Sequence, residues 1–447
     1  MTLGSGESDR IDVLDGPADR SARVAAGRVA LDRSVAELSP TVFTSLPRAD
    51  QRRKALMYLR GLLGATGRKS VRNIAAFLGD QVNDQGLHHF INDSTWEWAP
   101  MRAALGRHVL RRLPPRAYVV RPLLIPKSGT QSAGVTRMFS WERGQAVTAQ
   151  QVTGIWGTAA GTASPLNWHL HLPSGAPPGT GPATDAGSGE PTAAEEEMVG
   201  AFLQTATALA LPRRPVVLCA EHLDGIELAA RLGAAGLPYL TKIAGDTWLL
   251  PHDTSLPGWG ASLLQSGPLA RMARAGRRVA LVPSGASGTP ELVVTVRVRL
   301  PALRDTAERA AAGGDLLLIG VSRGRSPWCD ELWLTNMAHA DQVALMQLVR
   351  VSRRVERHGV PLAEQVGIRD FVGRSYAGWN RHATLASVAH AAAELAGLRP
   401  DVDLPVAPGR PPRGGPASPR FTRTRRPARV TLSPTRAVAG RGGARAV

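Results

Sequence analysis

The alternation of helical and strand patterns between residues 195 and 243 constrains the fold most strongly. Apolar residues recur at helical spacing in 195–211 and again in 226–235. Each of these stretches is followed by a short apolar run, at 215–220 and at 239–243. Strands that alternate with helices in this way form a sheet covered by helices. We therefore expect an α/β core.

Two adjacent prolines, Pro114 and Pro115, separate this core from a helical region. Apolar residues between Pro47 and Leu113 recur at helical spacing, which predicts a small helical domain over residues 41–114. After the prolines the pattern changes to that of β-strands. The strands expected there are 117–125, 146–156 and 166–172.

Other segments differ from the core in composition. Valine-rich runs from about residue 246 to 330 predict a β-rich insertion. Residues 173–193 are mostly Gly, Pro, Ser and Thr, so we expect a mobile loop. Residues 1–40 show no apolar pattern, and the basic segment 398–447 is rich in Pro and Gly. We expect both ends to be disordered.

The charge of the chain favours a polyanionic partner. The net charge is +18, and residues 401–447 contain ten Arg against two Asp. Nucleic acid is the usual partner of such a surface. Two cysteines are too few for a disulfide framework, which favours a reducing cytoplasm. No window reaches eighteen apolar residues, so we expect no membrane partner and no membrane span.

Four motifs and one strand occur in the order expected for one family of proteins. The strand is Tyr118–Ile125, and the motifs are 55–63, 127–135, 238–240 and 375–382. Together they resemble a bacterial insertion-sequence transposase of the DDE superfamily over about residues 45–396. The resemblance implies an α/β fold in which an RNase H-like mixed sheet is flanked by helices. A β-rich insertion would interrupt this domain, residues 115–397, and a helical DNA-binding domain would precede it.

In that family three carboxylates hold two divalent ions, usually Mg²⁺, at a DNA phosphodiester. The resemblance places the first acid on Arg121, the second on Glu221 and the third on Glu356. No Asp or Glu lies between Glu97 and Glu142 to replace the first. A guanidinium about 4 Å from a divalent ion repels it by roughly 8 kcal/mol at an effective dielectric constant of about 20. We therefore expect an inactive homologue without a cofactor.

Two other functions stay open. Cations that the family carries near its third acid fall on Ser352 and Ala363, which weakens the case for catalysis. An active transposase would need Mg²⁺ and a displaced acid, for which Glu142 and Asp224 are the candidates. A non-specific polyanion binder would rely on the arginine-rich C-terminal segment.

Basic residues of the helical region are the main candidates for DNA contacts. Several cations in one small helical unit can neutralise several phosphates, although a solvated face is the alternative. One lysine of the 127–135 motif and one arginine of the last helix join them. The candidates are Arg52, Arg53, Lys54, Arg68, Lys69, Arg72, Lys127 and Arg381. We expect a cytoplasmic, nucleoid-associated protein with DNA as partner, and a homodimer is left open.

For two pairs of potentially reactive side chains, we predict structural roles. His169 and His171 share one face of a strand, but two ligands without a nearby acid or cysteine indicate a polar sheet face. We therefore predict no metal site. Cys219 and His222 resemble a nucleophile and a base only by proximity, so a buried strand cysteine is favoured.

Overall fold

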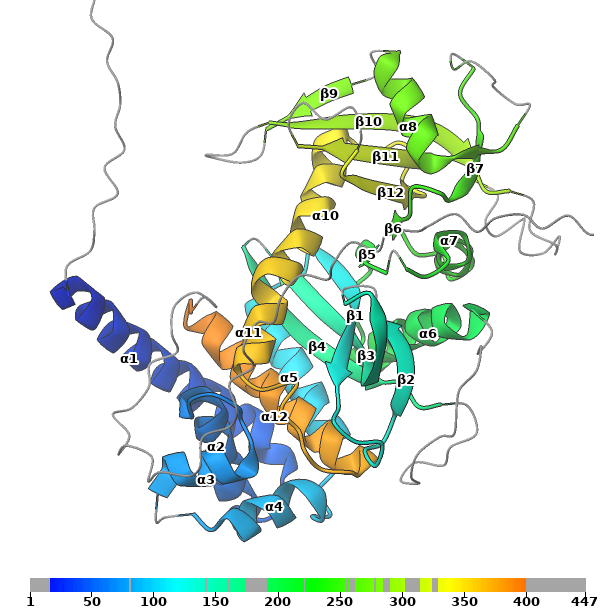
Figure 1. The fold of residues 1–447 in the computed structure, drawn as a ribbon. Helices are drawn as coiled ribbons and strands as arrows, with labels where there is room; N and C mark the ends of the chain where they lie inside the picture. The colour runs from blue at the N-terminus through cyan, green and yellow to red at the C-terminus, as the bar shows by residue number, and fades with distance from the viewer. Residues whose placement is uncertain are drawn as a thin grey trace, which may run out of the picture. The chain divides into compact units, whose positions relative to one another are not determined.

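A computed structural model describes residues 17–79, 82–140, 143–159, 161–173, 191–220, 222–254, 256, 262–276, 279–283, 290–301, 314–323 and 329–398. Its strands form one mixed sheet in the order β2-β3-β1-β5-β6-β12-β11-β10-β7-β8, with β4 on β3 and β9 on β10 (Figure 1). The strands are β1 (Ala117–Pro126), β2 (Val135–Ser140), β3 (Gln145–Ala159), β4 (Thr162–Leu170), β5 (Val216–Leu218), β6 (Tyr239–Ile243), β7 (Trp248–Pro251), β8 (Leu264–Gln265), β9 (Val279–Val282), β10 (Glu291–Arg299), β11 (Leu316–Ser322) and β12 (Glu331–Thr335).

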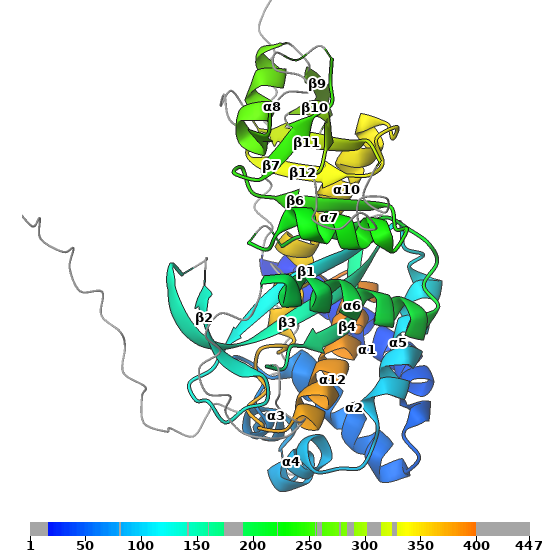
Figure 2. The same ribbon diagram turned by 90° about the vertical axis from the view of Figure 1, so that its right-hand side faces the viewer.

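The centre of the sheet combines antiparallel and parallel pairs. Strand β1 is antiparallel to β3 and parallel to β5, which in turn is parallel to β6. All three residues of β5 are buried, as expected for a strand covered on both faces. Helices α6 (Pro191–Leu209) and α7 (Gly225–Ala234) lie on one side of these strands, and α10 (Gln342–Arg354) and α12 (Tyr376–Leu395) lie on the other (Figures 1 and 2). The expected α/β architecture is confirmed.

Side-chain caps fix where two of these helices begin. The carboxylate of Asp341 accepts from the backbone N–H groups of Val343 and Ala344 at 3.1 and 3.4 Å, so α10 begins at Gln342. Asp224 caps α7 in the same way, through Ile226 at 2.8 Å. These short-range signals are readable in the sequence.

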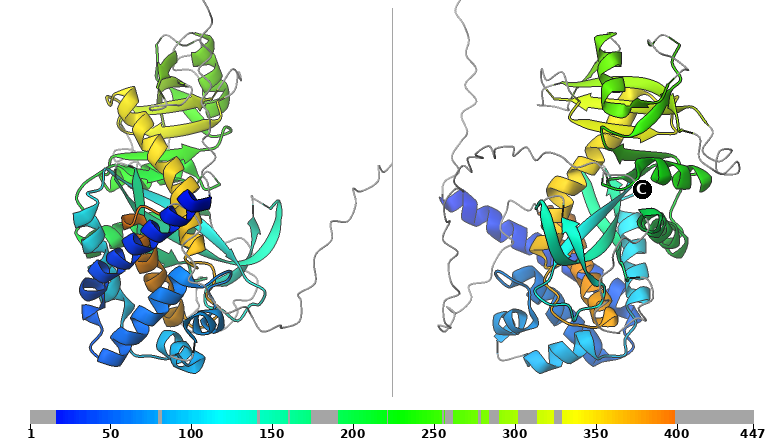
Figure 3. Two further views of the ribbon diagram at one scale, coloured as in Figure 1. Left: turned by 90° about the vertical axis from the view of Figure 1, so that its left-hand side faces the viewer. Right: turned by 45° about the vertical axis from the view of Figure 1, so that its right-hand side comes forward.

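Helix α12 is the centre of the helical region. Every side chain from Trp379 to Ala393 is buried, which identifies α12 as a core helix. Four helices from the N-terminal part of the chain pack against it (Figure 3). They are α1 (Pro17–Val42), α2 (Ala49–Gly64), α4 (Asp84–Asn92) and α5 (Trp98–Arg112). Because these helices share one hydrophobic core with the sheet, the region 41–114 is not a separate compact unit.

The N-terminal segment differs from the expectation of disorder over residues 1–40. Residues 17–42 form α1, and its Leu31, Val35 and Leu38 are buried at helical spacing against α5 and α12. The many polar residues between them hid this stripe in the sequence. Outside the described residues lie the start of the chain (1–16), most of the expected loop (174–190) and nearly all of the expected tail (399–447).

The expected β-rich insertion extends the main sheet. Strands β10 and β11 are antiparallel to each other, and β12 joins β11 to β6. Helix α8 (Ser266–Ala275) packs on β10 and β11. Helix α10 then crosses from this part of the sheet to β1 and β5, which brings a distant segment of the chain beside the central strands (Figure 1).

Candidate active site

Arg121 projects from the strand that the sequence assigned to the first acid. It lies on β1 opposite Gly154 of β3. On the other side of β1, the backbone N–H of Cys219, just after β5, donates to the carbonyl oxygen of Val120 at 3.0 Å. The segment that follows β5 therefore lies beside Arg121. Glu221, the candidate second acid, is outside the described residues.

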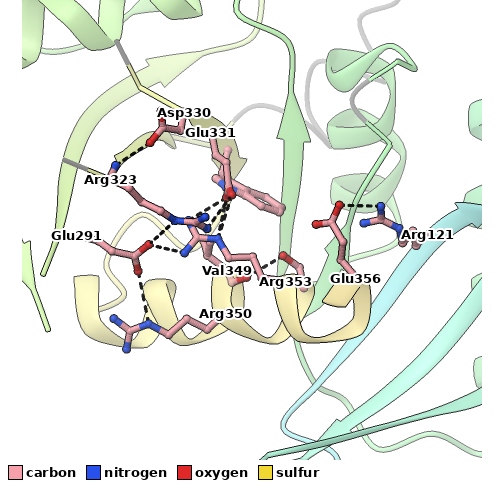
Figure 4. A network of polar contacts seen from close by, with 11 residues as sticks. Arg121, Glu291, Arg323, Asp330, Glu331, Val349, Arg350, Arg353 and Glu356 are labelled. Atoms are coloured by element: carbon pink, nitrogen blue, oxygen red, sulfur yellow. Dashed lines mark hydrogen bonds and ion pairs between the residues drawn. The ribbon is translucent and has the colours of Figure 1, made fainter. Parts of the chain in front are cut away.

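Glu356 reaches the same place from a π-helical turn. This turn, η3 (Val355–Gly359), joins α10 to α11 (Val360–Gln365). Nη2 of Arg121 donates to Oε1 of Glu356 at 3.1 Å (Figure 4). The two side chains are 24% and 51% exposed, so the ion pair is open to solvent. π-Helical turns often occur at functional sites. The structure thus joins the positions assigned to the first and third acids.

Cys219 lies beside this pair but is not a nucleophile at neutral pH. Burial raises the pKa of its thiol to about 11, although the charges of Arg121 and Lys242 and a hydrogen bond with Ser352 oppose this shift. Because the thiolate is the reactive form, the buried thiol is inert. This agrees with the structural role expected for Cys219.

Among the described residues, neither alternative acid joins Arg121 and Glu356. Asp224 is engaged in capping α7, and Glu142 lies outside the described residues. Ser352 and Ala363 are both buried and provide no cation. Within the residues that the structure describes, no cluster of three His, Cys, Asp or Glu side chains includes Glu356.

A second charged cluster, which sequence reasoning missed, surrounds Arg353 near the end of α10. Arg353 donates to Glu331 at 3.0–3.2 Å and to Glu291 at 2.5 Å (Figure 4). Arg323 and Arg350 also contact Glu291, at 3.3 and 3.7 Å. Burial raises the pKa of Glu291, but its hydrogen bonds and charge interactions with Arg353 and Arg323 together outweigh this, and the pKa is lowered. Through Arg353, Glu291 and Glu331 attach α10 to β10 and β12.

Three of the eight candidate DNA contacts are hydrogen-bonded within the protein itself. Lys69 is buried and donates to the carbonyl oxygen of Ala65. Lys127 donates to the carbonyl oxygen of Phe371 at 2.7 Å, and burial lowers its pKa to about 8. Each of these ammonium groups is already bound to the protein, so neither belongs to an open phosphate-binding surface.

Arg381 is the third of these residues. It is buried, and its guanidinium donates to the carbonyl oxygens of Trp96 at 3.0 Å and Ile91 at 3.1 Å. It also lies 5.6 Å from the ring centroid of Trp96. The sequence could not indicate this role, because its partners are backbone groups almost 300 residues away. The exposed candidates are Arg52, Arg53, Arg68 and Arg72, with Lys54 half-buried beside them.

The fold and these positions define an α/β protein of the RNase H-like class, in which the parallel pairing of β1 with β5 ends beside the candidate site. The chain belongs to the DDE superfamily endonuclease family, whose model matches residues 41–281. The matched segment includes Arg121 and the position of Glu221 and ends before Glu356. A search of curated proteins gives no match. No helix in the described part of the chain is long and apolar enough to cross a membrane.

Proposed function

We propose that this chain is a DNA-binding member of the DDE family that does not cleave DNA. The single observation that supports the proposal most strongly is the 3.1 Å ion pair between Arg121 and Glu356. The family's chemistry needs carboxylates around divalent ions. Here the permanently charged Arg121 lies where the first carboxylate is expected. Its charge neutralises Glu356, at the position of the third carboxylate.

The donor set does not fit the metal pair of the family. Glu356 is the one carboxylate in the described part of this site, and its Oε1 already accepts from Arg121. A divalent ion beside the guanidinium would be repelled, whereas the guanidinium itself supplies positive charge to Glu356. We therefore propose that the guanidinium of Arg121 supplies to Glu356 the positive charge that metal ions supply in the family.

The basic helical region supports the DNA-binding half of the proposal. Arg53, Arg68 and Arg72 are exposed within one helical unit, α2 to α3 (Val71–Leu78). Exposed cations bind phosphate without reading sequence and position a protein on DNA. The arginine-rich segment after residue 401 adds positive charge. An insertion-sequence origin and a place on the bacterial nucleoid belong to the same proposal.

A cleavage assay tests the proposal. Purified protein is mixed with Mg²⁺ or Mn²⁺ and a DNA that carries the sequences flanking its own gene, and binding and nicking are followed on gels. We expect binding without nicks. Metal-dependent nicking that disappears in Glu356→Ala would overturn the proposal.

A restored variant sharpens the test. Arg121→Asp with Glu221→Asp returns the family's two acids, and Arg121→Ala with Glu221→Asp is the matched control without the first carboxylate. We expect calorimetry to detect one more Mn²⁺ ion bound by the first variant than by the control or the unmodified protein. Equal Mn²⁺ binding by all three would show that Arg121 does not determine metal affinity at this site.

A further inference from the structure

Two histidines and a glutamate form a cluster at the opposite side of the sheet from the π-helical turn. His169 lies on β4, His171 directly follows it, and Glu197 lies on α6. Nε2 of His169 is 3.0 Å from Oε1 of Glu197, and Nδ1 of His171 is 2.7 Å from Oε2. No acid or cysteine lies near the two histidines in the sequence. In the fold, α6 brings Glu197 beside them as a third ligand.

The donor atoms are close enough to share one metal ion. One nitrogen of each imidazole and a carboxylate oxygen all lie within 4.8 Å of one another. Two ligands at about 2.05 Å from a tetrahedral ion lie roughly 3.3 Å apart, so the two N···O pairs need to open by about 0.3 and about 0.6 Å. Two His and one carboxylate are a common ligand set for Zn²⁺ and related divalent ions.

The residues around the cluster orient its ligands. Nε2 of His171 is 2.7 Å from the hydroxyl of Thr153, a fully buried residue of β3. Without a metal, Nδ1–H of His171 donates to Glu197 and Nε2 accepts from the Thr153 hydroxyl. When the ring proton moves to Nε2, that nitrogen donates to Thr153 and the lone pair of Nδ1 is available to a metal ion. The rings of His169 and His171 meet edge to face with centroids 5.2 Å apart, so each directs a nitrogen to the same carboxylate.

The charge of the cluster suits a cation. Burial raises the pKa of Glu197, but its contacts with His169 and His171 outweigh this and lower it to about 2. The carboxylate is therefore ionised at neutral pH. His171 and Glu197 are 10% and 36% exposed, so the cluster is partly enclosed yet open to an ion from solvent.

We propose that His169, His171 and Glu197 bind one divalent transition-metal ion of the Zn²⁺ class, with a fourth position open to water. The ion fastens the first half of α6 to β4. The site uses none of the positions assigned to the DDE acids, so it does not depend on the proposed function.

Metal binding is tested on the full-length protein with Co²⁺ and Zn²⁺ as probes. The protein is first treated with a chelator, then titrated with Co²⁺ while visible absorption is recorded, and Zn²⁺ affinity is measured by competition. We expect a d–d spectrum at one equivalent and its loss on adding Zn²⁺. Glu197→Gln, which keeps the shape of the side chain, should remove the signal. Thr153→Val should weaken Zn²⁺ binding roughly 10- to 100-fold by freeing the His171 ring.

The chain offers a matched control with the same chemistry on its surface. His88 and His89 lie 3.9 and 3.7 Å from Asp93, and all three side chains are about 60% exposed. The double variant His88→Ala, His89→Ala should retain the full Co²⁺ signal. Circular dichroism of each variant separates loss of a ligand from loss of folding.

The proposal is overturned if the chelated protein shows no Co²⁺ spectrum, or if the spectrum is unchanged in a folded Glu197→Gln variant. In either case the cluster is only a hydrogen-bonded ion pair.

Discussion

The hydroxyl of Tyr58 on α2 and Nδ1 of His382 on α12 are 2.8 Å apart in a fully buried hydrogen bond. The other ring nitrogen, Nε2, is 2.8 Å from the carbonyl oxygen of Gly367. Because a carbonyl oxygen only accepts, Nε2 carries the proton and Tyr58 donates to Nδ1. This hydrogen bond between α2 and α12 therefore requires that the imidazole of His382 is neutral.

Acid should destabilise the protein through this ring. Burial lowers the pKa of His382 to about 4, and it does the same for His390, whose Nε2 is 3.2 Å from the carbonyl oxygen of Gly359. Below about pH 6.5 the unfolded chain takes up protons that the folded protein refuses until about pH 4. Stability is thus complete above pH 6.5 and is lost as the pH falls toward 4. Urea unfolding at pH 7 and pH 5 measures the loss.

Nuclear magnetic resonance checks the cause of that loss. The Cε1–H signal of His382 in the folded protein should keep its neutral position at pH 5. A folded-state midpoint near 6.5 for this ring would contradict the assignment, whatever the urea curves show.

The two ion pairs on the α10 side of the sheet should differ strongly in their contribution to stability. Removing Arg353 leaves buried Glu291 and partly buried Glu331 without their main partner, so Arg353→Ala should cost about 3–5 kcal/mol. Arg121→Ala breaks a solvent-exposed pair and should cost less than about 1 kcal/mol. Chemical denaturation of both variants at pH 7 measures the difference. Equal losses would mean that the Arg353 cluster is as hydrated as the Arg121 pair.

Arg381 should matter for folding and not for DNA affinity. Arg381→Lys removes the planar guanidinium that bonds to Trp96 and Ile91, and we expect a loss of about 2–3 kcal/mol in the free energy of unfolding. At a temperature where the variant is folded, its DNA affinity should match that of the unmodified protein. A selective loss of DNA binding with unchanged stability would return Arg381 to the DNA surface.

The exposed arginines should show the opposite behaviour. Arg53→Ala and Arg72→Ala remove solvated cations, so stability should change by less than about 0.5 kcal/mol. If each side chain contacts one phosphate, each variant should lower the slope of log affinity against log salt by about 0.9. Fluorescence anisotropy over a range of salt concentrations measures the slope. Unchanged slopes in both variants would assign binding to another part of the chain.

Local pattern was enough to predict much of the fold. The strand at 117–125, the cap at Asp341 and the alternation of helix and strand from 195 to 243 all reflect contacts within a few residues, and each is found in the structure. The proposed position of the first acid at Arg121 also came from the sequence, because it depends only on order along the chain. Helix α1 was missed because its narrow apolar stripe is diluted by polar residues.

The tertiary structure decided which charged groups meet. Sequence spacing cannot show that Arg121 and Glu356 would pair across 235 positions, or that α6 would bring Glu197 to two histidines at the end of β4. Nor can it separate exposed Arg53 from buried Arg381, since both are cations on helices. A charge is paired or solvated according to which distant groups the packed core places beside it. Helix and strand boundaries depend on neighbours in the chain, whereas ion pairs and metal ligands depend on neighbours in space.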